Sequence, residues 1–162
     1  MVTGIIGAGA SGMAAALAAA ENESGQVVLM ERQARVGRKL QATGNGRCNL
    51  SNLHGTSGGY HGGNPGFADY ALRQFPPTAA LEWFRSLGLL TVAEDSGRVY
   101  PYSNQAADVL ALLELHLQRH TVQLRTGCTV STLRQSKGGY AVQFTNCLLY
   151  TSDAADEARS VD

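Results

Sequence analysis

The sequence predicts an α/β fold in which helices flank a parallel sheet and a small antiparallel β appendage is attached. Two observations lead to this fold class. A short apolar strand runs directly into a glycine-rich turn and an alanine-rich helix, and a second apolar strand follows, as in a βαβ unit. In the second half of the chain, short strand-like runs are separated by turn residues, which is typical of antiparallel strands.

The glycine-rich turn has the G-x-G-x-x-G spacing of dinucleotide-binding βαβ units. Gly7 allows a tight turn out of the strand, Gly9 lets the backbone approach a pyrophosphate, and Gly12 lets the helix pack closely against the sheet. The free N–H groups and the positive dipole end of the helix then face the phosphates. Ala10 and Ser11 belong to the same turn and are further candidate cofactor-binding residues.

Glu31 follows the second apolar strand, nineteen residues after the last glycine of the turn. A carboxylate at this point accepts hydrogen bonds from both ribose hydroxyls and repels a 2′-phosphate. The sequence therefore predicts a Rossmann-like site for an adenosine with a free 2′-hydroxyl. Arg32, the next residue, is included in the candidate site.

The first strand, the helix and the second strand are expected at residues 2–6, 11–22 and 26–30. The run of buried-type residues in the second strand suits a parallel sheet that is covered on both faces. A long, polar, glycine-rich stretch then extends to about residue 65. Such a loop is unusual in a compact domain unless a ligand organises it.

The later elements follow from hydrophobic periodicity and from the positions of Gly and Pro. A strand at residues 121–125 should extend the parallel sheet, whereas the last two strands should form the antiparallel appendage. Trp83 and Phe84 are expected to be core anchors, with flavin stacking as the alternative for these rings. The remaining expected elements are short helices at 67–75 and 77–87, a hairpin of 89–93 with 98–100, a long helix capped by Ser103, and strands at 129–135 and 140–144.

Charge is unevenly distributed along the chain. Five Lys or Arg residues and no carboxylate lie between Arg32 and Ala68, a distribution that suits a polyanionic ligand such as a pyrophosphate. A solvated basic loop is the alternative. The 162 residues can bury one core, and no apolar run is long enough to span a bilayer. RNA binding is disfavoured because aromatic residues are not interleaved with the basic ones.

Four motifs together resemble one family of proteins. They are the GAGASG turn with Glu31, the run GRKLQATGNGRCNLSN, the run YHGGNP, and the run GRVYPYSN before a helix. The sequence resembles the N-terminal third of the bacterial NAD(P)/FAD-dependent oxidoreductases, the aminoacetone oxidase-like flavoproteins. The resemblance covers residues 1 to about 146, so a truncated FAD-binding domain is expected.

The resemblance implies FAD as the cofactor and NAD(P)H as a co-substrate. The glycine turn and Glu31 would bind the ADP half of FAD, and the GRK and GNGRCN segments would follow the pyrophosphate toward the flavin. Val130 would lie near the adenine, and Arg98 and Tyr100 would border the flavin and the substrate. The GRK and GNGRCN segments nominate Arg38, Lys39, Gly44, Gly46, Arg47, Cys48 and Asn49.

Several alternatives stay open at this point. An NAD-dependent dehydrogenase fragment or a non-catalytic nucleotide-binding module would use the same turn and acid. Cys48 is expected to be a packing residue, the alternative being a redox thiol whose pKa Arg47 lowers. His61 could donate a proton to a substrate. No metal site is predicted, because the i,i+4 pair His116 and His120 has no third ligand beside it.

The last residues differ in character from the rest. Residues 147–162 resemble the translation of an adapter from a sequencing library, so we expect a non-native tail there and the FAD-binding part at residues 1–146. The fragment alone is expected to be inactive and to retain FAD weakly or not at all. The intact enzyme is expected to be cytoplasmic and to act on a small organic molecule, without nucleic acid or membrane partners.

Overall fold

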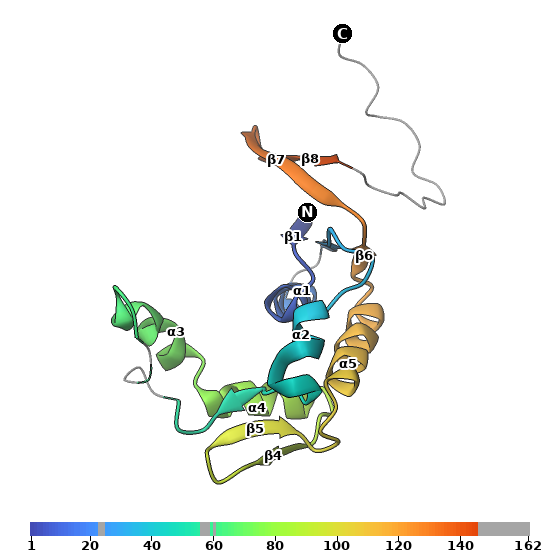
Figure 1. Ribbon diagram of the computed structural model, residues 1–162. Coiled ribbons are helices and arrows are strands. Elements are labelled where there is room, and N and C mark those ends of the chain that lie inside the picture. The colour runs from blue at the N-terminus through green and yellow to red at the C-terminus, as the bar shows by residue number, and fades with distance from the viewer. Residues whose placement is uncertain (23–24, 56–58, 60, 146–162) are drawn as a thin grey trace.

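The computed structural model describes residues 1–22, 25–55, 59 and 61–145. The expected non-native tail, residues 147–162, lies outside the described residues. In the described part, a parallel sheet has the strand order β1-β2-β6, made of β1 (Val2–Ile6), β2 (Gln26–Met30) and β6 (Gln123–Arg125) (Figure 1). The predicted α/β fold with a parallel sheet is confirmed.

The helix α1 (Ala10–Asn22) packs on β1 and β2 as a βαβ unit requires. Its buried residues are Met13, Ala16 and Leu17, which contribute to the core together with Leu29 of β2. All of β2 after its first residue is buried, in agreement with the continuous apolar run that predicted a central strand. The ends of β1 and β2 therefore lie side by side in the sheet. The glycine turn follows β1, and Glu31 follows β2.

The helix α5 (Ala106–Arg119) precedes β6 and packs against α1 (Figure 1). Right-handed crossovers from β1 to β2 and from β2 to β6 place both helices on the same face of the sheet. The predicted N-cap, Ser103, is wrong, because Gln105 occupies the N-cap position and makes no side-chain cap bond. Ser103 instead lies in a tight turn, in which Asn104 adopts a φ of 56° and donates its N–H to the Pro101 carbonyl.

The predicted long loop up to residue 65 contains regular structure. It includes α2 (Arg38–Ala42), η1 (Thr43–Gly46) and the short strand β3 (Ser51–Asn52). The sequence predicted a long polar, glycine-rich stretch here but did not identify these three elements within it. A five-residue helix with Leu40 as its buried residue is too short to produce a helical period in the sequence.

Antiparallel strands complete the fold at its two ends (Figure 1). One sheet has the order β3-β5-β4, and the β7–β8 hairpin lies at the opposite end of the molecule. Both hairpins were predicted from the sequence. The elements that complete the chain are η3 (Pro65–Ala68), α3 (Asp69–Gln74), α4 (Pro77–Ser86), β4 (Thr91–Ala93), β5 (Arg98–Pro101), β7 (Thr129–Ser136) and β8 (Gly139–Thr145).

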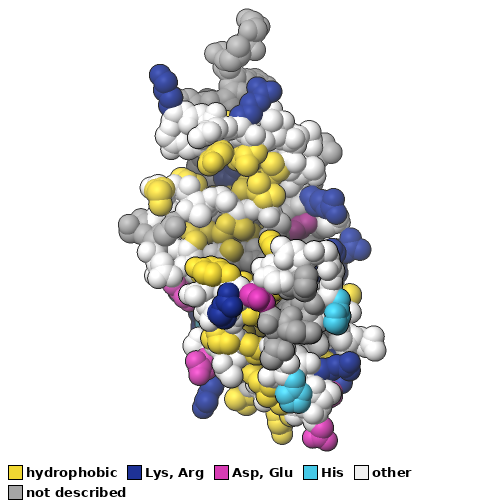
Figure 2. Space-filling model, turned by 90° about the vertical axis from the view of Figure 1, so that its left-hand side faces the viewer, with side chains coloured by type: hydrophobic (Ala, Val, Ile, Leu, Met, Phe, Trp, Pro, Cys, Tyr) yellow, Lys and Arg dark blue, Asp and Glu magenta, His cyan; other side chains and the backbone are white. Residues whose placement is uncertain are grey.

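The surface is mixed in character. Figure 2 shows hydrophobic side chains spread down one face of the molecule, with Lys and Arg mostly toward its margins. Among the described residues, no helix has the length and apolarity that crossing a membrane requires.

Candidate functional site

A hollow of about 530 Å³ opens beside the glycine turn, and we call it the basic hollow. It is formed by the turn after β1, the residues that follow β2, and the first part of α2. Four cationic side chains and one carboxylate line it, which makes it suited to a polyanion. The lining residues are Ala8, Gly9, Glu31, Arg32, Gln33, Arg35, Gly37, Arg38, Lys39 and Ala42.

The three glycines of the turn have different surroundings. Gly7 has a φ of 96° and donates its N–H to the Met30 carbonyl at 2.7 Å, which ties the turn to the end of β2. A side chain at Gly12 would bring its Cβ to 1.7 Å from the Gly7 carbonyl oxygen. A Cβ at Gly9 would meet no atom within 4 Å. The backbone of the turn therefore leaves no room for a side chain at Gly12. At Gly9, where the turn borders the basic hollow, the space beside the backbone is free.

Hydrogen bonds to the backbone fix the carboxylate of Glu31. Its Oε2 accepts the N–H of Ala8 at 2.8 Å, and its Oε1 accepts the N–H of Gln33 at 2.9 Å. The main chain of Glu31 is held as well, because its N–H donates to the Arg125 carbonyl and its carbonyl accepts the Cys128 N–H. Each carboxylate oxygen keeps acceptor capacity for a further donor. Glu31 is thus oriented toward the glycine turn from two sides.

The position of α2 depends on Gly37. Gly37 has a φ of 66° and donates its N–H to the Ala8 carbonyl at 2.9 Å. A Cβ on Gly37 would lie 2.5 Å from Cδ1 of Leu110, so a larger residue would push α2 away from α5. Arg38 is oriented by a hydrogen bond from its Nη1 to Oε1 of Gln33. These contacts bring the cations of α2 to the same hollow as Glu31.

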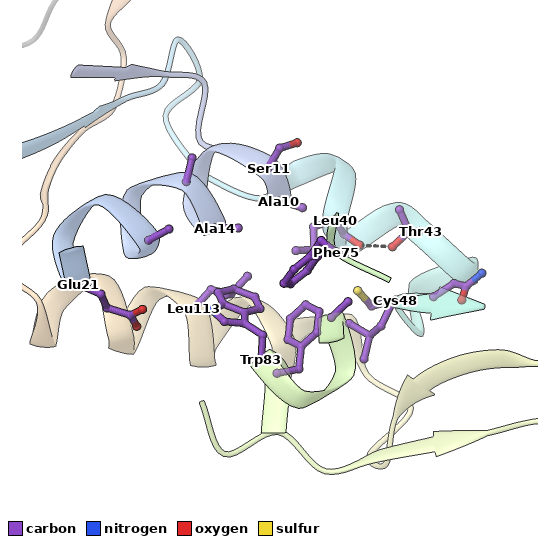
Figure 3. A pocket seen from close by; sticks show the side chains of 16 residues that line it. Ala10, Ser11, Ala14, Glu21, Leu40, Thr43, Cys48, Phe75, Trp83 and Leu113 are labelled. Carbon is purple, nitrogen blue, oxygen red and sulfur yellow. Dashed lines mark hydrogen bonds between the residues drawn. The ribbon is translucent and has the colours of Figure 1, made fainter. Parts of the chain in front are cut away.

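A second cavity of about 610 Å³ borders α1, α2, α4 and α5, and we call it the apolar cavity (Figure 3). Figure 3 shows Phe75, Trp83 and Leu113 around it, with Cys48 at the end near η1. Trp83 and Phe84 pack edge to face, with their ring centroids 4.9 Å apart, and are partly buried against the core. The lining residues are Ala10, Ser11, Ala14, Ala15, Ala18, Glu21, Leu40, Thr43, Cys48, Asn49, Leu50, Phe75, Ala80, Trp83, Phe84 and Leu113.

Cys48 is a buried free thiol beside the apolar cavity, with only 4% of its surface exposed. Burial raises the pKa of the thiol above its ordinary value of 9.0, and a hydrogen bond with Thr43 opposes this only in part. The alternative that Arg47 lowers this pKa is therefore wrong. A thiol with a raised pKa is a poor nucleophile at neutral pH, which favours the packing role that the sequence predicted.

The raised pKa of Cys48 predicts a loss of stability in alkali. Because the folded state favours the protonated thiol, its contribution is full below the unfolded pKa and is lost as the pH rises through the folded pKa. We expect the free energy of unfolding to fall more steeply above about pH 9 in the wild type than in Cys48→Ala. Urea unfolding at a series of pH values measures both slopes. Equal slopes would mean that the thiol is not desolvated in solution.

Arg47 lies outside the residues that line the basic hollow, although the family resemblance implied a role beside the pyrophosphate. Its Nε and Nη2 donate to Oδ1 of Asn104 at 2.9 and 2.8 Å, and Nη2 also pairs with Oε1 of Glu94 at 2.8 Å. The guanidinium stacks on Tyr100, with its Cζ 3.8 Å from the ring centroid. Its charge is thus directed toward the β4–β5 hairpin.

The other predicted site residues fall into two groups. Ala10, Ser11, Cys48 and Asn49 line the apolar cavity. The amide nitrogen of Asn49 faces the carbonyls of Ser51 and Val99, at 2.8 and 3.2 Å. Six predicted residues line neither the basic hollow nor the apolar cavity: Gly7, Gly12, Gly44, Gly46, Arg47 and Val130, the last of which pairs with Phe144 in the β7–β8 hairpin.

Five residues that line the basic hollow were not among the predicted site residues: Ala8, Gln33, Arg35, Gly37 and Ala42. Arg35 was visible in the basic run, and Ala8, Gly37 and Ala42 lie inside the quoted motifs, whereas Gln33 gave no signal of its own. His116 contacts the Leu87 carbonyl through Nε2 at 3.0 Å. In the described part of the chain, no three His, Cys, Asp or Glu residues are arranged so as to hold a metal ion.

Residues 2–154 match the model of a protein family described as "HI0933-like protein Rossmann domain". Among solved structures, THI4 of Thermovibrio ammonificans is similar, with a TM-score of 0.57 and 17% sequence identity. That comparison covers 87% of this chain and 45% of the other chain. At this identity the likeness concerns the fold, which is the Rossmann fold expected from the sequence.

Two curated relatives show higher sequence similarity. The chain is 47% identical over 141 residues to a 3-dehydro-bile acid delta(4,6)-reductase of Clostridium scindens, and the match covers 86% of this chain. It is 28% identical over 138 residues to a ribosomal RNA dihydrouridine synthase of Escherichia coli, with 85% of this chain covered. In both cases the match covers 34% of the relative, so the chain spans about a third of the length of these proteins.

Proposed function

The chain belongs to the HI0933-like Rossmann-domain family, as its motifs predicted, and on this premise we propose that it is the FAD-binding part of a flavin-dependent oxidoreductase. The observation that carries the proposal is the basic hollow. It places the open glycine turn, the oriented carboxylate of Glu31 and four cationic side chains around one space beside the parallel sheet. A dinucleotide with a pyrophosphate and a free ribose hydroxyl matches this set of groups.

Different residues of the basic hollow would bind different parts of FAD. Gly9 leaves room for a phosphate close to the backbone, and the N-terminus of α1 offers N–H groups to it. Arg38 and Lys39 would supply positive charge from α2, and Glu31 would accept hydrogen bonds from the ribose. Bound FAD would supply electron and hydride transfer, which no side chain of the chain provides. The residues of the chain would therefore bind FAD and orient it.

NAD(P)H as the reductant and a small organic molecule as the substrate complete the proposal. The Clostridium scindens relative is named as a reductase of a bile acid derivative, and its 47% identity favours a small molecule. The Escherichia coli relative, named for ribosomal RNA, is 28% identical and supports an RNA substrate less strongly. Because the chain spans about a third of either relative, we propose that catalysis needs the longer protein and that residues 1–146 alone bind FAD weakly.

The test is a titration of the purified chain with FAD and, separately, with NADH. Trp83 is the one tryptophan of the sequence, so a change in its fluorescence reports on a single place beside the apolar cavity. We expect FAD to bind in the micromolar range (about −8 kcal/mol) and to be lost on gel filtration, and we expect NADH to bind more weakly.

Arg38→Ala should weaken FAD binding by about tenfold, because it removes one charge from the hollow. Arg134→Ala on the exposed hairpin strand β7 is the matched control and should leave the affinity unchanged. Quenching by NADH but not by FAD would favour an NAD-dependent dehydrogenase. Binding of neither nucleotide would contradict the proposed function.

A further inference from the structure

The segment of residues 38–49 stands between the two cavities, and we call it the partition. Arg38, Lys39 and Ala42 face the basic hollow, whereas Thr43 and Cys48 face the apolar cavity. One end of the partition is tied to the glycine turn through the bond that precedes α2, from the Gly37 N–H to the Ala8 carbonyl. The position of both cavity walls therefore depends on how the other end is held.

The backbone at that other end turns sharply through the left-handed region. Gly44, Asn45, Gly46 and Cys48 all have positive φ, between 55° and 85°. Asn enters the left-handed region readily, so the strain falls on Cys48, which persists there only when its surroundings enforce it. Hydrogen bonds within the segment, from the Cys48 N–H to the Thr43 carbonyl at 3.0 Å and from the Arg47 N–H to the Gly44 carbonyl at 3.1 Å, hold part of this turn, and contacts from outside the segment add to them.

Arg47 makes contacts that connect this segment to a distant part of the chain. It lies inside this segment and reaches three partners that are distant in sequence: Glu94, Tyr100 and Asn104. The fork of the guanidinium spans Glu94 and Asn104, while its face covers the Tyr100 ring at 3.8 Å. Tyr100 also closes against the segment directly, because its Cε1 would be 3.1 Å from a Cβ on Gly44. The end of the partition is thus fastened to the β4–β5 hairpin.

We propose that Arg47 is a positioning residue, which holds the partition against the β4–β5 hairpin and so shapes the cofactor site without contacting the cofactor. This inference rests on the proposed FAD binding, since that is the function the partition would serve. Arg32, Arg35, Arg38 and Lys39 already provide the positive charge of the basic hollow. The Nε and Nη2 groups of Arg47 donate instead to Asn104 and Glu94 beside the β4–β5 hairpin.

The two roles open to Arg47 predict opposite effects of Glu94→Gln. If Arg47 positions the partition, loss of the Glu94 charge loosens the contact and weakens FAD binding. If Arg47 instead moves to a phosphate when FAD binds, Glu94 competes for it, and Glu94→Gln strengthens FAD binding. Arg47→Lys separates the roles in a second way, because lysine keeps the charge but cannot form the planar fork or stack in the same manner.

The experiment measures two quantities on Arg47→Ala, Arg47→Lys, Glu94→Gln and the double variant Arg47→Ala/Glu94→Gln. The first is the dissociation constant for FAD. The second is the alkylation rate of Cys48, read by mass spectrometry on the peptide that contains it, because this buried thiol reacts only when the partition opens. Arg85→Ala, at an exposed arginine of α4, is the matched control.

We expect Arg47→Ala and Arg47→Lys to raise both the dissociation constant and the alkylation rate by about five- to tenfold, and Glu94→Gln by about two- to threefold. The double variant should be no worse than Arg47→Ala, because both changes remove the same contact. Arg85→Ala should change neither quantity.

The inference is overturned if Glu94→Gln tightens FAD binding, if Arg47→Lys retains wild-type affinity, or if Cys48 alkylation is unchanged in every variant. Failure of the wild-type chain to bind FAD would contradict the proposed function instead. In that case the alkylation rates still decide whether Arg47 holds the partition, because they require no cofactor.

Discussion

Gly12→Ala should lower the free energy of unfolding by at least about 3 kcal/mol, and we expect little folded protein to be recovered. The added Cβ would lie 1.7 Å from the Gly7 carbonyl oxygen, which is far inside van der Waals contact. The backbone fixes the position of the Cβ, and the oxygen is itself a backbone atom, so no side-chain rotation can relieve the overlap. The first turn of α1 would have to move away from the end of β1, and the buried contact of Met13 would be lost with it. Urea unfolding followed by circular dichroism measures the effect.

Gly9→Ala is the matched control within the same motif. A Cβ at Gly9 would meet no atom within 4 Å, and Gly9 is not among the glycines with positive φ. We expect a free energy of unfolding within about 1 kcal/mol of the wild type. FAD affinity should nevertheless fall by at least about tenfold, because the methyl group occupies the space where a phosphate approaches the backbone. If Gly9→Ala bound FAD as tightly as the wild type, the basic hollow would not be the pyrophosphate site.

The glycine turn is also the part of the molecule that the sequence predicted best, for a physical reason. Its geometry depends on interactions within one βαβ unit, from β1 to Glu31, where Gly7 has a positive φ and Gly12 has no room for a Cβ. The strands β1 and β2 were predicted with the bounds that the structure has. Local sequence therefore carries enough information for the turn and for the acid that faces it.

Arg47 shows why the rest of the candidate site was harder to predict. Its partners Glu94 and Asn104 lie 47 and 57 residues away in sequence, so nothing near Arg47 indicates them. A basic residue in a glycine-rich run predicts a phosphate ligand, and the sequence does not indicate the additional contacts of Arg47 with Glu94, Tyr100 and Asn104. The helix α2 escaped prediction for a similar reason, since it is five residues long and is held by Gly37 and Leu40 against distant elements.

The apolar cavity could be predicted from the sequence only in part. The alanines of α1 signalled a helix with a small-residue face, and Trp83 signalled a core position. Trp83 and Phe84 do pack against the core, but they also border a cavity of about 610 Å³. Periodicity identifies which face of a helix is apolar. Periodicity does not indicate how far away the opposite wall of a cavity lies, because that wall is formed by elements distant in sequence, such as the partition.

Glu31→Ala should weaken FAD binding by about thirtyfold or more, while the chain stays folded. The variant removes an acceptor from the N–H groups of Ala8 and Gln33, and it removes the acceptor proposed for the ribose hydroxyls. Hydrogen bonds to a charged group are each worth about 1.5–3 kcal/mol, which sets the expected size of the effect. Both hydrogen bonds are partly buried and Ala8 itself is fully buried, so the N–H groups left without an acceptor should lower the free energy of unfolding by about 1–3 kcal/mol. Fluorescence titration and urea unfolding measure the two effects separately.

A comparison of ADP with 2′-deoxy-ADP decides whether Glu31 contacts the ribose or only shapes the turn. The wild type should bind ADP about tenfold more tightly, because the deoxy ligand cannot donate a 2′-hydroxyl to the carboxylate. Glu31→Ala should bind the two ligands equally, since the acceptor that distinguishes them is gone. If Glu31→Ala weakened both ligands by the same factor and kept the preference for ADP, Glu31 would act only by holding Ala8 and the glycine turn. The preference would then have to arise from another residue of the basic hollow, for which Gln33 is placed best, because its backbone already bonds to Glu31 and its side chain lines the same space.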